Sequence, residues 1–99
     1  MPSDPGSDEH FEHDDAAHRF TLSSGSSHAV LDYRERGPRT LEYYHTFVPP
    51  PMRGRGVASR LVANALRYAL AQHISVIPTC PFVAAFVRKN TEYAAVLRR

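Results

Sequence analysis

The chain has 99 residues, of which 42% are hydrophobic, and a formal net charge of +2. That length suits one small domain with a single core, and no apolar run is long enough to span a bilayer. The only cysteine, Cys80, excludes an internal disulfide, so nothing argues for export. The acidic start lacks the basic and then apolar layout of a signal peptide. We therefore expect a cytoplasmic protein with no membrane insertion.

The charge is distributed unevenly along the chain. Residues 1–17 hold six acids and no Lys or Arg, whereas residues 18–99 hold twelve Lys or Arg and four acids, a net charge of +8. Since the first segment contains little that can be buried, we predict a disordered acidic tail over 1–17 and a folded domain over 18–99. His10, His13 and His18 fit no helical spacing and no cysteine joins them, so we predict no metal site.

Three strands are predicted before residue 49. They have β-rich or alternating composition and are separated by turn residues; they are Phe20 to Ser23, His28 to Arg36 and Arg39 to Val48. Such short connections favour an antiparallel meander.

The third strand carries the titratable side chains of His45 and Glu42. Strict alternation predicts that His45 and Phe47 share a face with Leu41 and Tyr43, and that Glu42 lies on the other face. The prolines at 49–51 then end the strand, because proline has no N–H to donate.

A glycine- and arginine-rich loop follows, reading Arg53-Gly54-Arg55-Gly56-Val57-Ala58 in an R-x-x-G-x-A pattern. Glycines allow close approach to the backbone, and the N–H groups can point to one spot at the positive end of the following helix. The two arginines can hold phosphate oxygens in bidentate fashion. The loop therefore predicts a phosphate or pyrophosphate site, although a solvated Gly-Arg turn is the simpler alternative.

The second half of the chain reads as helix, strand and helix. Apolar residues recur at helical spacing from Val57 to Leu70, and Ile74 to Pro78 is a short β-rich run, which indicates a parallel crossover. Cys80 precedes Pro81, and proline is favoured at the first helical position, so Cys80 is the expected N-cap of another helix. A short last helix is expected over Thr91 to Leu97.

Several motifs in this order resemble the small, single-domain GNAT-like N-acetyltransferase family, over roughly Phe20 to Tyr93. The motifs are His45 to Pro49 (HTFVP), Arg53 to Ala58 (RGRGVA), Ile77 to Cys80 (IPTC) and Phe82 to Phe86 (FVAAF). The resemblance implies a compact α/β GNAT-like fold with a mixed, mainly antiparallel sheet. It also implies a long helix after the phosphate loop and a second helix led by Cys80.

The resemblance further implies that acetyl-CoA is the cosubstrate and that an acetyl group is transferred to a primary amine. The pantetheine arm would pair with the strand end, and the pyrophosphate would bind the loop; the residues are Phe47, Val48, Arg53, Gly54, Arg55, Gly56, Val57 and Ala58. The chain is about half as long as many enzymes of the superfamily, so an open acceptor pocket is expected, suited to a protein lysine or a small polyamine.

Three residues are candidates for catalysis. The helix dipole favours the thiolate of Cys80, although an unpaired cysteine is more often a small buried hydrophobe. His45 and Glu42 are candidate bases, and both also have ordinary structural explanations. The amine either attacks the thioester directly, which we favour, or attacks an acetyl group first carried by Cys80.

The chain departs from the superfamily at the second helix. By resemblance, Cys80 stands where an asparagine is usual, and Phe86 stands where a tyrosine often protonates the leaving thiolate. Phe86 cannot donate a proton, so Cys80 or another group must do so, or turnover is slow. Tyr93 could reach the site, but core packing explains it equally well.

Two other functions fit parts of the sequence. A non-catalytic acyl-CoA-binding module would agree with the missing tyrosine. A basic nucleic-acid binder is disfavoured because the aromatic residues follow core periodicity. We expect a monomer or weak dimer.

Overall fold

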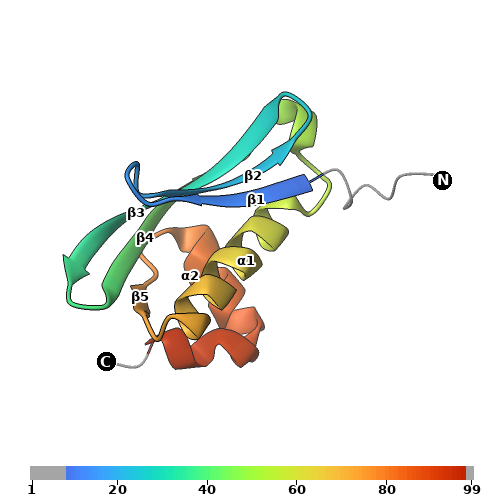
Figure 1. Cartoon of the computed structure of the whole chain (residues 1–99). Helices are drawn as coiled ribbons and strands as arrows, with labels where there is room; N and C mark the ends of the chain where they lie inside the picture. The colour runs from blue at the N-terminus through green and yellow to red at the C-terminus, as the bar shows by residue number, and fades with distance from the viewer. Residues whose placement is uncertain (1–8, 98–99) are drawn as a thin grey trace.

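The computed structural model describes residues 9–97 as a mixed sheet with helices against one face (Figure 1). The elements are β1 (Glu9–Asp14), β2 (Arg19–Ser24), β3 (Ser27–Gly37), β4 (Thr40–Phe47), η2 (Pro50–Met52), α1 (Val57–Ala71), β5 (Ser75–Ile77), α2 (Pro81–Lys89) and η3 (Thr91–Leu97), where η marks a 3-10 helix. The predicted α/β class, the long helix and the helix led by Cys80 are confirmed.

The sheet has five strands, in the order in which they occur along the chain. Neighbours from β1 to β4 are antiparallel, and β5 is parallel to β4. A parallel neighbour needs a crossover, which η2 and α1 provide. The predicted meander and the predicted crossover are both confirmed.

Strand β1 forms one edge of the sheet. It pairs with β2 along its whole length, beginning with Glu9 opposite Ser24. The prediction of a disordered tail is therefore wrong from residue 9 onward, while residues 1–8 lie outside the described residues. Alternate side chains of β1 face the helices and hold it there. Phe11 and His13 both stack on Phe20, with ring centroids 5.8 and 4.5 Å away.

The hydrophobic core lies between the sheet and α1. Leu61 and Leu66 of α1 are fully buried, as the helical spacing of apolar residues predicts. Tyr43 of β4 is also fully buried, and its hydroxyl donates a 2.8 Å hydrogen bond to the carbonyl of Ala65. This packing fixes α1 against β4, and the loop that joins them is held at both ends.

A β-bulge interrupts β4 at Tyr44. In β3, Asp32 lies opposite His45, yet the next residue, Tyr33, lies opposite Tyr43. Tyr44 is therefore an extra residue with no partner in β3.

The bulge changes which later side chains face the helices. Thr46 lies opposite Leu31, a fully buried core residue, and directly opposed residues share a face. His45 and Phe47 thus project from the other face of the sheet, away from α1, which we call the outer face. The prediction that they share a face with Tyr43 is wrong, because strict alternation does not continue through a bulge.

Candidate coenzyme site

The predicted phosphate loop forms a tight turn between η2 and α1. Gly54 and Gly56 both have positive φ, at 78° and 72°, in the left-handed region that favours glycine. Gly56 is the N-cap of α1 and offers no side-chain capping bond. The helix thus begins without a capping side chain, which leaves its positive end accessible from the loop.

The backbone amides of this turn are available to a ligand. The first helical bond runs from the amide of Arg60 to the carbonyl of Gly56, at 3.1 Å. Within residues 9–97, no acceptor pairs with the amides from Gly54 to Ser59. Unpaired N–H groups at a helix start form an anion site.

An open pocket of about 210 Å³ lies beside these amides. Its lining joins the end of β4, the loop, the first turn of α1 and one side chain of α2; the residues are Val48, Met52, Arg53, Gly54, Gly56, Val57, Ala58, Ser59 and Phe82. Six of the eight predicted coenzyme residues line it. Phe47 and Arg55 do not, since Phe47 projects from the outer face and Arg55 is exposed on the loop.

Arg53 folds back over the end of β4. Its Nε donates to the carbonyl of Val48 at 2.8 Å, and its guanidinium carbon lies 5.9 Å from the centroid of the Phe47 ring. The side chain therefore anchors the loop to the strand end, and the guanidinium adds positive charge at the mouth of the pocket.

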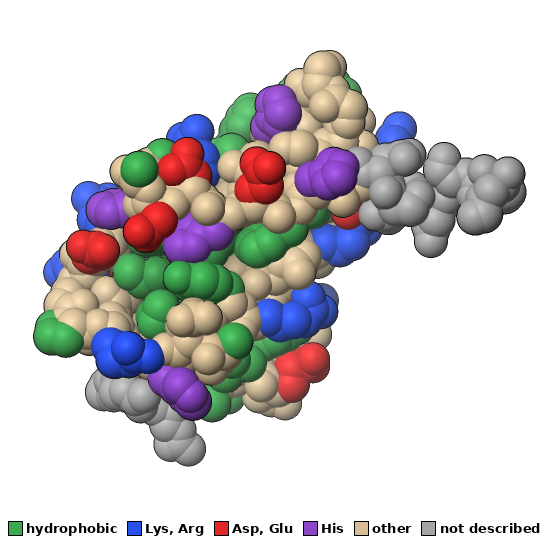
Figure 2. Space-filling view, viewed as in Figure 1, with side chains coloured by type: hydrophobic (Ala, Val, Ile, Leu, Met, Phe, Trp, Pro, Cys, Tyr) green, Lys and Arg blue, Asp and Glu red, His purple; other side chains and the backbone are tan. Residues whose placement is uncertain are grey.

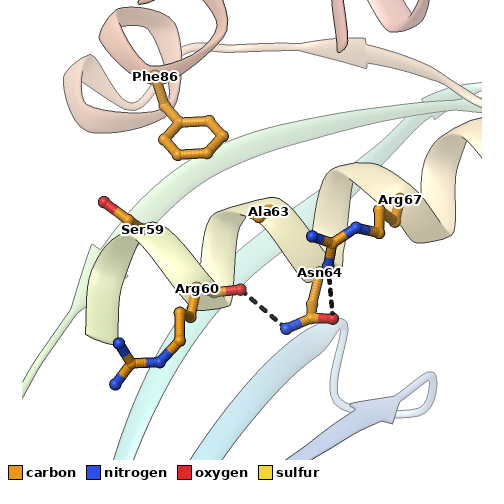
Figure 3. A pocket seen from close by; sticks show the side chains of 6 residues that line it. All are labelled: Ser59, Arg60, Ala63, Asn64, Arg67 and Phe86. Carbon is orange, nitrogen blue, oxygen red and sulfur yellow. Dashed lines mark hydrogen bonds between the residues drawn. The ribbon is translucent and has the colours of Figure 1, made fainter. Parts of the chain in front are cut away.

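A second pocket, of about 340 Å³, continues along α1 and shares Ser59 with the first. Figure 3 shows the Phe86 ring of α2 hanging over Ser59 and Ala63. On α1, Arg67 donates to the side-chain oxygen of Asn64 at 3.1 Å, and Asn64 donates to the carbonyl of Arg60 at 2.9 Å. The pocket thus combines an aromatic ring with two arginines.

Strands β4 and β5 separate beside the first pocket. The pairing of β4 with β5 ends where Glu42 lies opposite Ile77. After this point, the amide of Cys80 donates a 3.0 Å hydrogen bond to the carbonyl of Tyr43. In the part of the chain that the structure describes, no strand pairs with this edge of β4 after Glu42.

Cys80 lies where these strands separate. It is the N-cap of α2, as predicted, and is 6% exposed. Its sulfur lies 3.5 Å from Oγ1 of Thr46, which the bulge turns toward the helices. The hydroxyl is thus the polar neighbour of the thiol, whereas His45 and Glu42 project from the outer face.

Glu42 is held in a cluster of hydrogen bonds and charges. It accepts bonds from Thr79 Oγ1 at 2.6 Å and Arg36 Nη1 at 2.8 Å, and Arg34 Nε lies 3.5 Å away. The Thr79 hydroxyl, together with the Arg36 guanidinium, lowers the pKa of Glu42 below its ordinary value. A carboxylate so committed is a weak base, and this geometry favours a structural role.

His45 is exposed on the outer face, opposite Asp32. Asp32 itself accepts from Arg19 Nε at 2.6 Å. His45 is therefore accessible from the side of the sheet opposite to Cys80. Tyr93, the other candidate for proton transfer, is 5% exposed and packs on Phe86 with ring centroids 5.7 Å apart, which favours core packing.

Three further residues of this region were not found from sequence. Phe82 lines the first pocket, Thr46 contacts Cys80, and Glu9 binds Arg60. Phe82 and Phe86 are four apart on α2 and therefore share a face, a signal that the sequence does contain. Thr46 depends on the bulge and Glu9 on a contact between distant segments, and neither leaves a local pattern.

The chain shares its sequence pattern with known proteins. A sequence profile described as GCN5-related N-acetyl-transferase matches residues 19–96. The chain belongs to this family. Protein NATD1 of Xenopus tropicalis is 33% identical over 89 residues, covering 88% of this chain and 82% of that protein. Protein NATD1 of Homo sapiens is 35% identical over 81 residues, covering 80% and 72%.

A solved structure supports the GCN5-related fold independently. The NMR structure of a Staphylococcus aureus protein described as GCN5-like superposes with a TM-score of 0.70, at 20% identity, covering 91% of this chain and 88% of the other. The predicted compact GNAT-like fold is confirmed.

Residues 9–97 contain no group of three or more His, Cys, Asp or Glu placed to hold a metal ion. No helix in that range has the length and apolar character needed to cross a membrane.

Proposed function

We propose that this GCN5-related protein binds acetyl-CoA and transfers its acetyl group to a primary amine. The observation that carries the proposal is the set of amides from Gly54 to Ser59 that have no acceptor within residues 9–97 and lie beside a pocket at the start of α1. A diphosphate is the coenzyme group that fits such amides.

The two pockets suit different parts of the coenzyme. The pyrophosphate binds the amides of residues 54–59 and the guanidinium groups of Arg53 and Arg55. The pantetheine arm runs along Phe47 and Val48 into the gap between β4 and β5, past the exposed ring of Phe82. The second pocket offers Arg67 for the 3′-phosphate and the ring of Phe86 for the adenine.

Acetyl transfer occurs where β4 and β5 separate. The amine nitrogen attacks the thioester carbonyl carbon, the carbon–sulfur bond breaks, the coenzyme thiolate leaves and the new amide nitrogen loses a proton. Because the bulge at Tyr44 takes backbone out of the ladder, amides of β4 polarise the carbonyl. His45, on the outer face, accepts the proton from an amine arriving on that side, and Cys80, on the helix side, protonates the thiolate.

Glu42 remains the less favoured base because of its low pKa and its partners. In the covalent route, Cys80 takes the acetyl group first and passes it to the amine. We favour direct attack. The acceptor is a protein lysine or a small polyamine, and the protein acts in the cytoplasm as a monomer or weak dimer without nucleic acid.

Binding is tested by titrating acetyl-CoA against thermal stability and by calorimetry. Specific binding raises the midpoint with ligand concentration. An unchanged midpoint at millimolar ligand contradicts the coenzyme assignment.

Activity is tested with a panel of polyamines and lysine peptides. Formation of acetylated amine supports the enzyme. Coenzyme binding without transfer to any acceptor supports an acyl-CoA-binding module, the alternative that the phenylalanine at position 86 favours. Mass spectrometry of the protein after incubation with acetyl-CoA separates the routes, because only the covalent route places an acetyl group on Cys80.

A further inference from the structure

Among the described residues, the side chain of Glu9 links the first strand to the coenzyme loop. Glu9, at the start of β1, has a side chain only 9% exposed and accepts two bonds from Arg60 of α1, from Nε at 2.8 Å and Nη2 at 2.5 Å. Figure 1 shows the start of β1 beside the first turns of α1, and Figure 2 shows basic side chains at the same place. Such a two-point pair fixes the guanidinium plane.

The remaining nitrogen of Arg60 holds the loop itself. Its Nη1 donates to the carbonyl of Arg55 at 2.8 Å. The guanidinium also lies close to the turn, since a Cβ placed on Gly56 would be 3.3 Å from Nη1. Arg60 therefore contacts the strand with one edge and the loop with the other.

This contact sets the direction of one binding amide. The peptide between Arg55 and Gly56 is planar and trans, so its carbonyl and its N–H point in opposite directions. Because Arg60 holds the carbonyl, the N–H of Gly56 is turned away from Arg60. A loop with two glycines has many alternative conformations, and holding one of them lowers the entropy lost on binding.

We propose that Glu9 is a positioning residue of the coenzyme site, acting through Arg60 to hold the loop in its anion-binding conformation. The inference rests on the proposed coenzyme binding. It makes the N-terminal strand part of the site, although that strand touches neither pocket.

The test measures the affinity for acetyl-CoA by calorimetry in Glu9→Gln, Arg60→Gln and the double variant. Glu12→Gln is the matched control, because Glu12 is exposed on the opposite face of the same strand. We expect Glu9→Gln to weaken binding about five- to tenfold, since it removes a charge-assisted pair. We expect Glu12→Gln to leave the affinity for acetyl-CoA unchanged. In the Arg60→Gln background, we expect Glu9→Gln to cause no further loss of affinity.

A second measurement follows the amide of Gly56 by NMR without ligand. Its resonance should move in Glu9→Gln and Arg60→Gln but stay in place in Glu12→Gln. If Glu9→Gln does not fold, the same measurements are made on Glu9→Asp, which keeps the negative charge on a shorter side chain. We expect Glu9→Asp to lose less affinity for acetyl-CoA than the five- to tenfold expected for Glu9→Gln.

Three results overturn the inference. The first is an affinity of Glu9→Gln for acetyl-CoA within twofold of that of the unaltered protein. The second is a higher affinity of Glu9→Gln, which would mean that Glu9 repels the phosphates. The third is a loss of affinity from Glu9→Gln that is equally large in the presence of Arg60 and in the Arg60→Gln background. An unaltered protein that does not bind acetyl-CoA refutes the proposed function instead, so the two failures are distinguishable.

Discussion

Gly56→Ala tests the phosphate loop most directly, because a matched glycine elsewhere separates strain from binding. Gly56 has φ of +72°, and an L-residue in the left-handed region costs about 1–2 kcal/mol. For a domain of this size, each kcal/mol lowers the melting midpoint by roughly 4–8 °C. The new Cβ also meets Arg60 Nη1 at 3.3 Å, the atom that holds the carbonyl of Arg55.

Gly25, in the turn between β2 and β3, provides the control. Its φ is +60°, and a Cβ there would meet nothing within 4 Å. Gly25→Ala therefore carries a similar backbone cost without touching the loop. We expect both variants to lose similar stability in calorimetric melting, but only Gly56→Ala to lose affinity for acetyl-CoA, by about tenfold or 1.4 kcal/mol. Affinity of Gly56→Ala within twofold of the unaltered protein would refute the role assigned to this amide turn.

Three other predictions concern the second pocket and two titrating groups. Arg67→Ala should weaken CoA binding about fivefold and leave dephospho-CoA unaffected if Arg67 meets the 3′-phosphate; equal losses for both ligands would contradict that placement. Burial lowers the pKa of His13, so its protonation favours unfolding and stability should fall as the pH drops below about 6.5. Thermal melts of His13→Gln should lack this fall, whereas melts of His10→Gln, an exposed control on β1, should keep it. The pKa of Glu42 is lowered by Thr79 and Arg36, so its stabilising effect is present above its ordinary value of 4.5 and is lost as the pH falls through the folded pKa. Glu42→Gln should lower the melting midpoint at pH 7 and have less effect at pH 3, while a catalytic role would instead reduce acetyl transfer with the midpoint unchanged.

The sequence predicts those parts of the fold that have a local signal. Helical spacing locates α1 to within a residue of its observed span from Val57 to Ala71, and the prolines and glycines locate the loop. The Cys80-Pro81 pair locates the start of α2. These elements succeed because their patterns depend on near neighbours alone.

Strand β1 was missed because its pattern looks like that of a solvated tail. Its segment, EHFEHD, has a single large apolar residue, Phe11, and is otherwise acids and histidines. It is ordered by distant partners, with Glu9 on Arg60 and His13 Nε2 2.6 Å from the Tyr33 hydroxyl. Composition cannot reveal a polar strand whose partners are supplied by tertiary structure.

The candidate site was predicted unevenly for the same reason. Six of the eight residues predicted to contact the coenzyme line one pocket, because the loop and helix are contiguous in sequence. The faces of His45 and Glu42 were predicted from strict alternation along β4. The unpaired residue Tyr44 puts His45 on the outer face instead of the face of Tyr43, and it turns Thr46 toward Cys80.

The extra residue at Tyr44 also offers a clean way to dissect the strand. Since Tyr43 and His45 already lie opposite consecutive residues of β3, deleting Tyr44 keeps every later side chain on its present face. The deletion removes the β-bulge, so the backbone of β4 regains regular hydrogen bonding to β3 at this point. Under the proposed function, a protein without Tyr44 would still bind acetyl-CoA and present every other side chain of β4, yet it would lose the main-chain contribution to acetyl transfer, so the two contributions can be measured separately.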